Sequence, residues 1–220
     1  MSVIYDLEHI TTYHYRKPVT FGEHRAIFLP SAGHGERIIS YSVEANIAAK
    51  TRWTMDTLSN NVVELEFAEP ASELIVTCRL RAEHFGLKAI ADFPLDQRAI
   101  EIPIQYTPDE WLDLVVFMRP HAEDADGSLA AWAKSFVAGD QDDTLDVMER
   151  MMAAIKDNFT YQSRESEGTQ SPGETLRLKS GTCRDYAWLM IEALRRLGLA
   201  CRFVSGYLYD AALDGGEVGM

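Results

Sequence analysis

The chain has 220 residues, enough for one large domain or two small ones, and its 46% hydrophobic and 25% charged residues are typical of a globular protein. Its net charge of −13 would repel nucleic acid and anionic membrane surfaces, so we expect it to bind neither. Three cysteines, with no C-x-x-C pair, argue against a disulfide framework and against a cysteine-based zinc site.

The negative charge is concentrated in the second half of the chain. Residues 1–88 carry 9 basic and 11 acidic side chains, whereas residues 89–220 carry 12 and 23. The N-terminal stretch MSVIYDLEHITTYHY lacks the basic segment and apolar run of a signal peptide. No apolar stretch approaches the ~20 residues that a membrane span needs. These features predict a cytoplasmic protein with reduced thiols.

The first half of the chain has the two-residue alternation of β-strands. Residues 9–15 alternate, with His9, Thr11, Tyr13 and Tyr15 on one face and Ile10, Thr12 and His14 on the other. Residues 61–67 and 73–84 alternate in a similar way, and the second of these runs has a clearly apolar face. Turn-forming residues separate these runs. Several short strands at such spacing predict an antiparallel β-sandwich over residues 1–95.

The second half has helical patterns. Prolines at 94, 103 and 108 indicate a connecting segment, after which residues 128–138, 144–159 and 174–180 are predicted to be helical. The apolar stripe of the second of these helices is interpreted as core. Its members are Leu145, Met148, Met152, Ile155 and Phe159.

An acidic cluster precedes the second of these helices. It consists of Asp140, Asp142, Asp143 and Asp146. The cluster lacks the glycine and the terminal glutamate of an EF-hand loop, and acidic residues at a helix start are explained by the helix dipole. We therefore expect no metal site there.

The stretch SGTCRDYAWLMIEALRRLG predicts a helix over residues 183–197. Thr182 and Asp185 form a capping box that places Cys183 at the first helical position, and Gly198 ends the helix. Unpaired backbone N–H groups and the positive end of the helix dipole stabilise a thiolate at such a position. The same N–H groups can hold an oxyanion during acyl transfer.

Cys183 is therefore a candidate nucleophile, but a free cysteine can also be a small buried core residue. The residues around it leave both interpretations open. Cys78 lies on the apolar face of a predicted strand, and Cys201 opens the alternating run CRFVSGYLY. Both are interpreted as core thiols.

The segment G-T-C-R-D-Y-A-W-L-M, followed by ALRRLGLACRFVSGYLY, resembles the core of the transglutaminase-like superfamily of the bacterial type. The motif H-x-T-x-Y-x-Y-x-x-P-V at residues 9–19, with Asp56 and Asn60, resembles the β-rich domain that precedes this core. The resemblance implies an α+β fold. An N-terminal antiparallel β-sandwich (1–95) would be followed by part of a papain-like or transglutaminase-like core (96–220), with a strand over 200–209 after the helix that bears Cys183.

The resemblance also implies an activity. Cys183 would attack a carboxamide of a protein or peptide substrate and form a thioester acyl-enzyme, which an amine or water then resolves. The protein would thus be an acyltransferase, a cysteine protease or an amidase, and neither a cofactor nor a metal is implied.

The family's catalytic order is Cys, His, Asp, and no histidine follows Cys183. His9 and His14 are interpreted as residues of a sandwich face, His121 is a weak candidate base, and Asp210 and Asp214 are interpreted as turn residues. We therefore expect the chain to be the N-terminal part of a longer enzyme, truncated before the histidine and aspartate and inactive by itself.

A second hypothesis is a non-catalytic module that binds a protein partner through the β-rich domain. A truncated sheet would expose an unpaired edge, which promotes self-association, so a homo-oligomer formed through that edge is a further expectation.

Overall fold

The structure, a computed structural model, describes residues 2–31, 33, 35–86, 95–163 and 168–209. The chain divides into two compact units, residues 1–93 and 94–220, so the boundary lies two residues before the one expected from the sequence. Each unit has its own core of buried apolar side chains. The predicted turn residues Asp210 and Asp214 lie outside the described residues.

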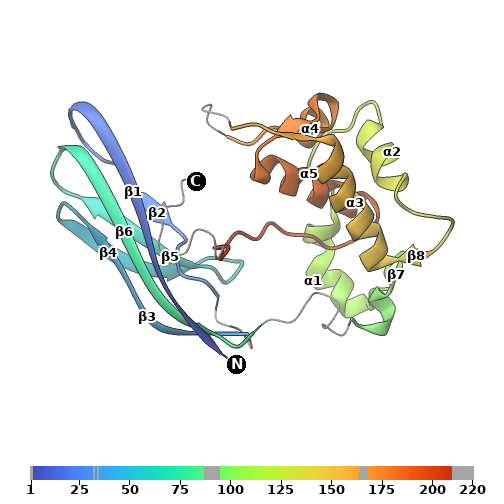
Figure 1. The fold of residues 1–220 in the computed structure, drawn as a ribbon, viewed down its shortest axis with the longest axis horizontal. Coiled ribbons are helices and arrows are strands. Elements are labelled where there is room, and N and C mark those ends of the chain that lie inside the picture. The colour runs from blue at the N-terminus through green and yellow to red at the C-terminus, as the bar shows by residue number, and fades with distance from the viewer. Residues whose placement is uncertain (1, 32, 34, 87–94, 164–167, 210–220) are drawn as a thin grey trace. The chain divides into compact units, whose positions relative to one another are not determined.

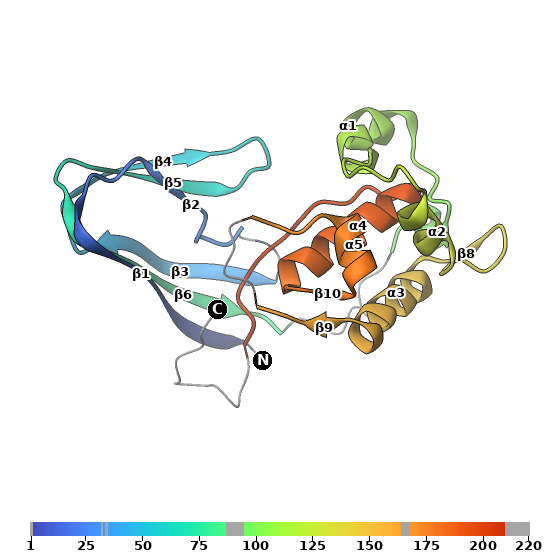
Figure 2. The same ribbon diagram turned by 90° about the horizontal axis from the view of Figure 1, so that it is seen from above.

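The first unit is a sandwich of two antiparallel three-stranded sheets, as predicted. Figure 2 shows these sheets as two layers. One sheet has the order β1-β6-β3 and the other β2-β5-β4. The strands are β1 (Val3–Val19), β2 (His24–Ala26), β3 (Glu36–Ala45), β4 (Ala49–Met55), β5 (Asn61–Phe67) and β6 (Ala71–His84).

Alternation along β5 and β6 builds the core of the first unit. Val63 and Leu65 of β5 pack with Leu74 and Val76 of β6, together with Phe21 from the segment before β2. Because successive strand residues point to opposite faces, the other side chains of β6 form a polar outer face.

Arg79 of β6 shows how that outer face is paired. Its guanidinium bonds to Glu8 of β1 at 2.8 Å and to Glu44 of β3 at 3.0 Å, and so it joins all three strands. His9, predicted to lie on a sandwich face, is in β1, where its ring packs against Phe28 at 5.0 Å between ring centroids.

The second unit consists mainly of helices joined by two short strand pairs (Figure 1). The helices are η2 (Gln97–Ala99), α1 (Pro108–Met118), α2 (Ser128–Lys134), α3 (Thr144–Asn158), α4 (Pro172–Leu178) and α5 (Cys183–Arg196). Antiparallel β7 (Glu101–Ile102) and β8 (Asp142–Asp143) form one pair, and parallel β9 (Thr160–Tyr161) and β10 (Ser180–Gly181) form the other.

Helix α1 begins within the segment that the prolines had indicated as a connection. Thr107 caps it, with the Thr107 and Glu110 side chains each accepting a backbone N–H of the other residue. Pro108 occupies the first turn, where a missing N–H costs nothing. The proline therefore starts a helix here and does not interrupt one.

Helix α3 buries a stripe that neighbours the predicted one. Val147 and Met151 are fully buried, whereas the side chain of Met152 is 43% exposed. Met148, Ile155 and Phe159 pack against the core from its margin. The Met-rich helix thus contributes to the core, but Met152 does not.

Helix α5 agrees with the prediction to within one residue. Leu189, Ala193 and Leu194 are buried in the core of the second unit with Leu129 of α2 and Met151 of α3. Leu197 ends the helix, and Gly198 follows with φ +86°, the left-handed conformation expected of a stop residue.

The strand expected over residues 200–209 is not formed, which corrects the sequence-based prediction. No strand pairs with these residues in the part of the chain that the structure describes. Alternation makes a segment suited to a sheet, but a strand forms only when its backbone groups bond to a neighbour. The start of the segment is held by α1, since the Cys201 N–H donates to the Phe117 carbonyl oxygen at 3.0 Å.

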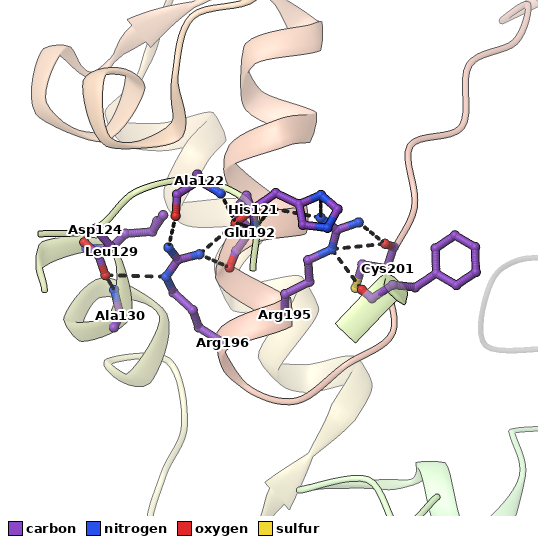
Figure 3. A network of polar contacts seen from close by, with 10 residues as sticks. His121, Ala122, Asp124, Leu129, Ala130, Glu192, Arg195, Arg196 and Cys201 are labelled. Atoms are coloured by element: carbon purple, nitrogen blue, oxygen red, sulfur yellow. Dashed lines mark hydrogen bonds and ion pairs between the residues drawn. The ribbon is translucent and has the colours of Figure 1, made fainter. Parts of the chain in front are cut away.

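A buried carboxylate organises the C-terminal half of α5 (Figure 3). Glu192 is fully buried and forms ion pairs with Arg195 and Arg196, both at 2.9 Å, whose side chains are 9% and 10% exposed. The carboxylate also accepts the backbone N–H groups of His121 and Ala122 at 3.0 Å. One acidic side chain thus binds the segment between α1 and α2 to α5.

The two arginines also bond to groups outside α5. Arg195 donates to the carbonyl oxygen of Cys201 at 2.7 Å, which fixes the path of the chain after α5. Arg196 donates to the carbonyl oxygen of Ala122 at 2.8 Å and pairs with Asp124 at 3.4 Å. Asp124 in turn accepts the N–H groups of Leu129 and Ala130 at the start of α2.

Replacing Glu192 by Gln is expected to lower the free energy of unfolding by about 3 kcal/mol, because two nearly buried guanidinium groups lose their countercharge. Burial alone would raise the pKa of Glu192, but hydrogen bonds from Ala122, Arg196, His121 and Arg195 outweigh it and lower the pKa. The greater stability of the wild type is therefore present above about pH 4.3, the ordinary pKa of a glutamate. It is lost as the pH falls through the lower pKa that Glu192 has in the folded state.

Urea unfolding of both proteins between pH 3 and 8 measures this difference. Glu174→Gln is the matched control, because Glu174 forms an exposed pair with Arg177 and should cost under about 1 kcal/mol. Equal losses of unfolding free energy in the two variants would contradict the claim that the buried Glu192 carboxylate stabilises the second unit.

Candidate functional site

Cys183 is the first residue of α5, and its side chain is exposed. Thr182 caps the helix as predicted, with the Thr182 hydroxyl accepting the Asp185 N–H and the Asp185 carboxylate accepting the Thr182 N–H at 2.8 Å. The exposure of the thiol removes the interpretation of Cys183 as a buried core residue. Its role as a nucleophile stays a prediction.

Asp185 does more than close the capping box. Its side chain is fully buried, and one oxygen accepts both the N–H and the hydroxyl of Thr182, at 2.8 and 2.9 Å. The other oxygen accepts the N–H of Gln170 at 2.7 Å. The carboxylate therefore joins the start of α5 to the segment before α4.

Gln170 and Gly181 complete the support beneath the cysteine. The Gln170 amide donates to the Ser180 carbonyl oxygen at 2.9 Å and to the Thr175 hydroxyl at 3.0 Å. A Cβ atom on Gly181 would lie 3.0 Å from the Asp185 Cβ. Glycine at 181 therefore permits the close approach that the buried carboxylate needs.

The pairing of β9 with β10 places Tyr161 opposite Gly181, two residues before the cysteine. The hydroxyl of Tyr186 donates to the carbonyl oxygen of Thr160 at 2.5 Å, and burial raises the pKa of that hydroxyl. The ring of Tyr186 meets Phe159 edge-on, with 5.8 Å between ring centroids. The first turn of α5 is thus fixed against β9.

The helix start leaves two donors beside the thiol. The Asp185 and Tyr186 N–H groups bond to Thr182, but the N–H groups of Cys183 and Arg184 have no hydrogen-bond acceptor among the described residues. Together with the dipole of a 14-residue helix, these donors suit a developing oxyanion. The arrangement can therefore support nucleophilic attack on an acyl group.

No histidine of the second unit lies beside Cys183. His121 is its single histidine, and the Nδ1 atom of His121 accepts from Arg195 at 3.3 Å (Figure 3). Arg195 follows Cys183 by twelve residues, which is about 18 Å along a helix. His121 and Cys183 are therefore not brought together. The other five histidines belong to the first unit.

The remaining thiols have different surroundings. Cys78 is fully buried in β6, as predicted, and burial raises its pKa. Cys201 packs at the margin of the helical core, though not in the strand expected there, and burial raises its pKa to about 11. Neither is placed for nucleophilic chemistry.

The acidic cluster before α3 has structural partners. Asp142 pairs with Arg150, and Asp143 caps α3 by accepting the Asp146 N–H at 3.0 Å. In the described ranges, no group of three or more His, Cys, Asp or Glu side chains is arranged to hold a metal ion.

The sequence-based account missed Gln170 and the ionic network of Glu192. Gln170 carries no local signal, because its contacts reach five to fifteen residues along the chain. Glu192 does carry a local signal. It lies between Leu189 and Ala193 of the buried stripe, and arginines follow it three and four residues later, at the spacing of ion pairs on a helix.

Two family models match the chain. The bacterial transglutaminase-like N-terminal region matches residues 5–83, and the transglutaminase-like superfamily matches residues 130–218. The first match covers the strands of the sandwich. The second covers the helices from α2 onward, including Cys183.

Individual proteins are similar over parts of the chain. Uncharacterized proteins of Mycobacterium tuberculosis and Mycobacterium bovis are 38% identical over 64 residues, which is 29% of this chain and 20% of each relative. A crystal structure described as a "putative cysteine protease" from Cytophaga hutchinsonii has a TM-score of 0.61 at 14% identity. That match covers 90% of this chain and 66% of the other, and because the identity is only 14% it bears on the fold alone.

Among the described residues, no helix is both long enough and apolar enough to cross a bilayer.

Replacing Gly181 by Ala is expected to lower the free energy of unfolding by roughly 1–3 kcal/mol, because the new methyl group overlaps the Asp185 side chain. Thermal unfolding measures the loss. Gly173→Ala is the control, since nothing lies within 4 Å of a Cβ there and alanine favours the α4 helix. Equal stability of Gly181→Ala and the wild type would show that Asp185 is not confined by position 181.

Proposed function

Because the chain belongs to the transglutaminase-like superfamily, with the bacterial N-terminal region ahead of the core, we propose that Cys183 is the nucleophile of a cysteine enzyme acting on carboxamide groups of proteins or peptides. The observation that carries the proposal is the exposed thiol at the capped start of α5, within the matched core. Transfer to an amine and transfer to water are both open to such an enzyme.

The first step forms a bond between the Cys183 sulfur and the carbonyl carbon of the substrate. The carbonyl oxygen becomes an oxyanion, which the N–H groups of Cys183 and Arg184 can stabilise. When the tetrahedral species collapses, the C–N bond breaks and a thioester remains on the cysteine. An amine or water then attacks the thioester and restores the thiolate.

The amide step needs a proton donor for the departing nitrogen, because an amide anion is a very poor leaving group. His121 is held at the far end of α5 by Arg195 and cannot supply that proton. We therefore propose that Cys183 is acylated much faster by donors whose leaving group needs no proton than by simple amides.

Iodoacetamide at pH 8 is expected to alkylate Cys183 first, because its thiol is exposed while Cys78 is buried. With a pKa of about 11, only roughly one Cys201 thiol in a thousand is ionised at that pH. Mass spectrometry of peptides after graded labelling gives the three rates. Cys183→Ala should remove the fast phase and leave the two slow ones.

A p-nitrophenyl ester tests acyl transfer itself, because p-nitrophenolate leaves without a proton. The expected product is one acyl group per chain on Cys183, detected as a mass increase that hydroxylamine reverses. Cys201→Ala is the matched control and should be acylated like the wild type. Acylation that persists in Cys183→Ala would overturn the proposal.

A further inference from the structure

An apolar groove of about 390 Å³ lies on the second unit between α3 and α5. Its lining consists of Met152, Ile155, Lys156 and Phe159 on one side, Tyr186, Ala187 and Met190 on the other, and Tyr161 of β9. Lys156 is the single charged residue among them. The volume lies at the lower end of the range for sites that bind small ligands.

The groove lies on the face of α5 that carries the cysteine. Positions 183, 186, 187 and 190 are spaced by three, four and seven residues, so they share one side of the helix. Tyr186 and Ala187 follow Cys183 by a single turn, about 5.4 Å along the axis. Tyr161, which also lines the groove, stands opposite Gly181 in the β9–β10 pair.

We propose that this groove is the subsite that selects the acyl donor, and that it takes an uncharged apolar side chain, aliphatic or aromatic, of the peptide that Cys183 attacks. The inference rests on the proposed function and adds the substrate class. A peptide whose carbonyl carbon is at the Cys183 sulfur would have its neighbouring side chains about one helical turn from Tyr186 and Ala187, which line the groove.

The lining also determines which side chains are excluded. Exposed Met152 and Tyr161 offer an apolar contact surface that is open to solvent in the chain by itself. A basic side chain would meet Lys156 and lose hydration without gaining a countercharge. The groove should therefore discriminate against lysine and favour leucine or phenylalanine over glycine.

Chloromethyl ketones of acetylated amino acids test this selection without the need for a proton donor. The Cys183 thiolate attacks the methylene carbon and displaces chloride, so the rate reports how well the neighbouring side chain is bound. Each rate is divided by the rate of the same protein with chloroacetamide, which carries no side chain. The leucine and phenylalanine reagents are expected to label Cys183 about tenfold faster than the glycine or lysine reagents.

Variants of the groove locate the effect. Met152→Glu places a charge on a 43%-exposed position, and Met152→Ala removes apolar surface there with little risk to folding. Both variants should reduce the ratio of the normalised labelling rates with the leucine and glycine reagents. In Met152→Glu this ratio should fall to near one. Leu112→Ser, at a 74%-exposed position of α1 outside the groove, is the control and should keep the full preference.

The outcomes separate the two proposals. Absence of labelling at Cys183 with every reagent, chloroacetamide included, would overturn the proposed function. Labelling of Cys183 at equal normalised rates for glycine, lysine and leucine reagents would overturn the groove as a subsite and leave the nucleophile in place. A preference that survives in Met152→Glu would likewise overturn it.

Discussion

The position of Cys183 depends on two buried carboxylates on a single face of α5. Asp185 binds the start of the helix to Gln170 and Thr182, and Glu192 binds its second half to the segment that follows α1. Both are fully buried, and they are seven residues apart, so they lie on the same side of the helix. Removing a charge from water is costly, and it is offset here because each oxygen receives N–H donors or a guanidinium group. The helix is thereby fixed at both ends, with the thiol held at its exposed start.

The two faces of α5 thus have separate tasks. One face carries the carboxylates and Leu189 into the core of the second unit. The other carries Cys183 and, one and two turns later, Tyr186 and Met190 along the apolar groove. The two faces are not independent, because Ile155, Phe159 and Met190 of the groove also pack against the core. Tyr186 likewise lines the groove and bonds to the Thr160 carbonyl oxygen, so changes to the groove are expected to affect the support of the cysteine.

Much of this arrangement was predictable from local signals. Two-residue alternation located β1, β5 and β6, and the Thr182 capping box located the start of α5, because both patterns act between near neighbours in the chain. The strand expected over 200–209 was wrong, since alternation cannot say whether a pairing partner is present. Helix α1 was missed because Pro108 was interpreted as a break, although proline is favoured in the first turn. Gln170 was beyond reach for a different reason, because its contacts to Asp185 and Ser180 span fifteen and ten residues of the chain. Glu192 did carry a local signal in the arginines three and four residues later, and it was missed although it was present.

Gly181 and Asp185 constrain each other, since the buried carboxylate lies where a side chain at position 181 would extend. While Asp185 is present, a Cβ atom at position 181 would lie about 3 Å from it, so a larger residue there requires the carboxylate to shift. Without Asp185 this restriction on position 181 is relaxed, but the anchor of the helix start is lost. A change of either residue alone is therefore expected to weaken the support of the thiol, so the two positions should vary together among proteins that keep the same cysteine.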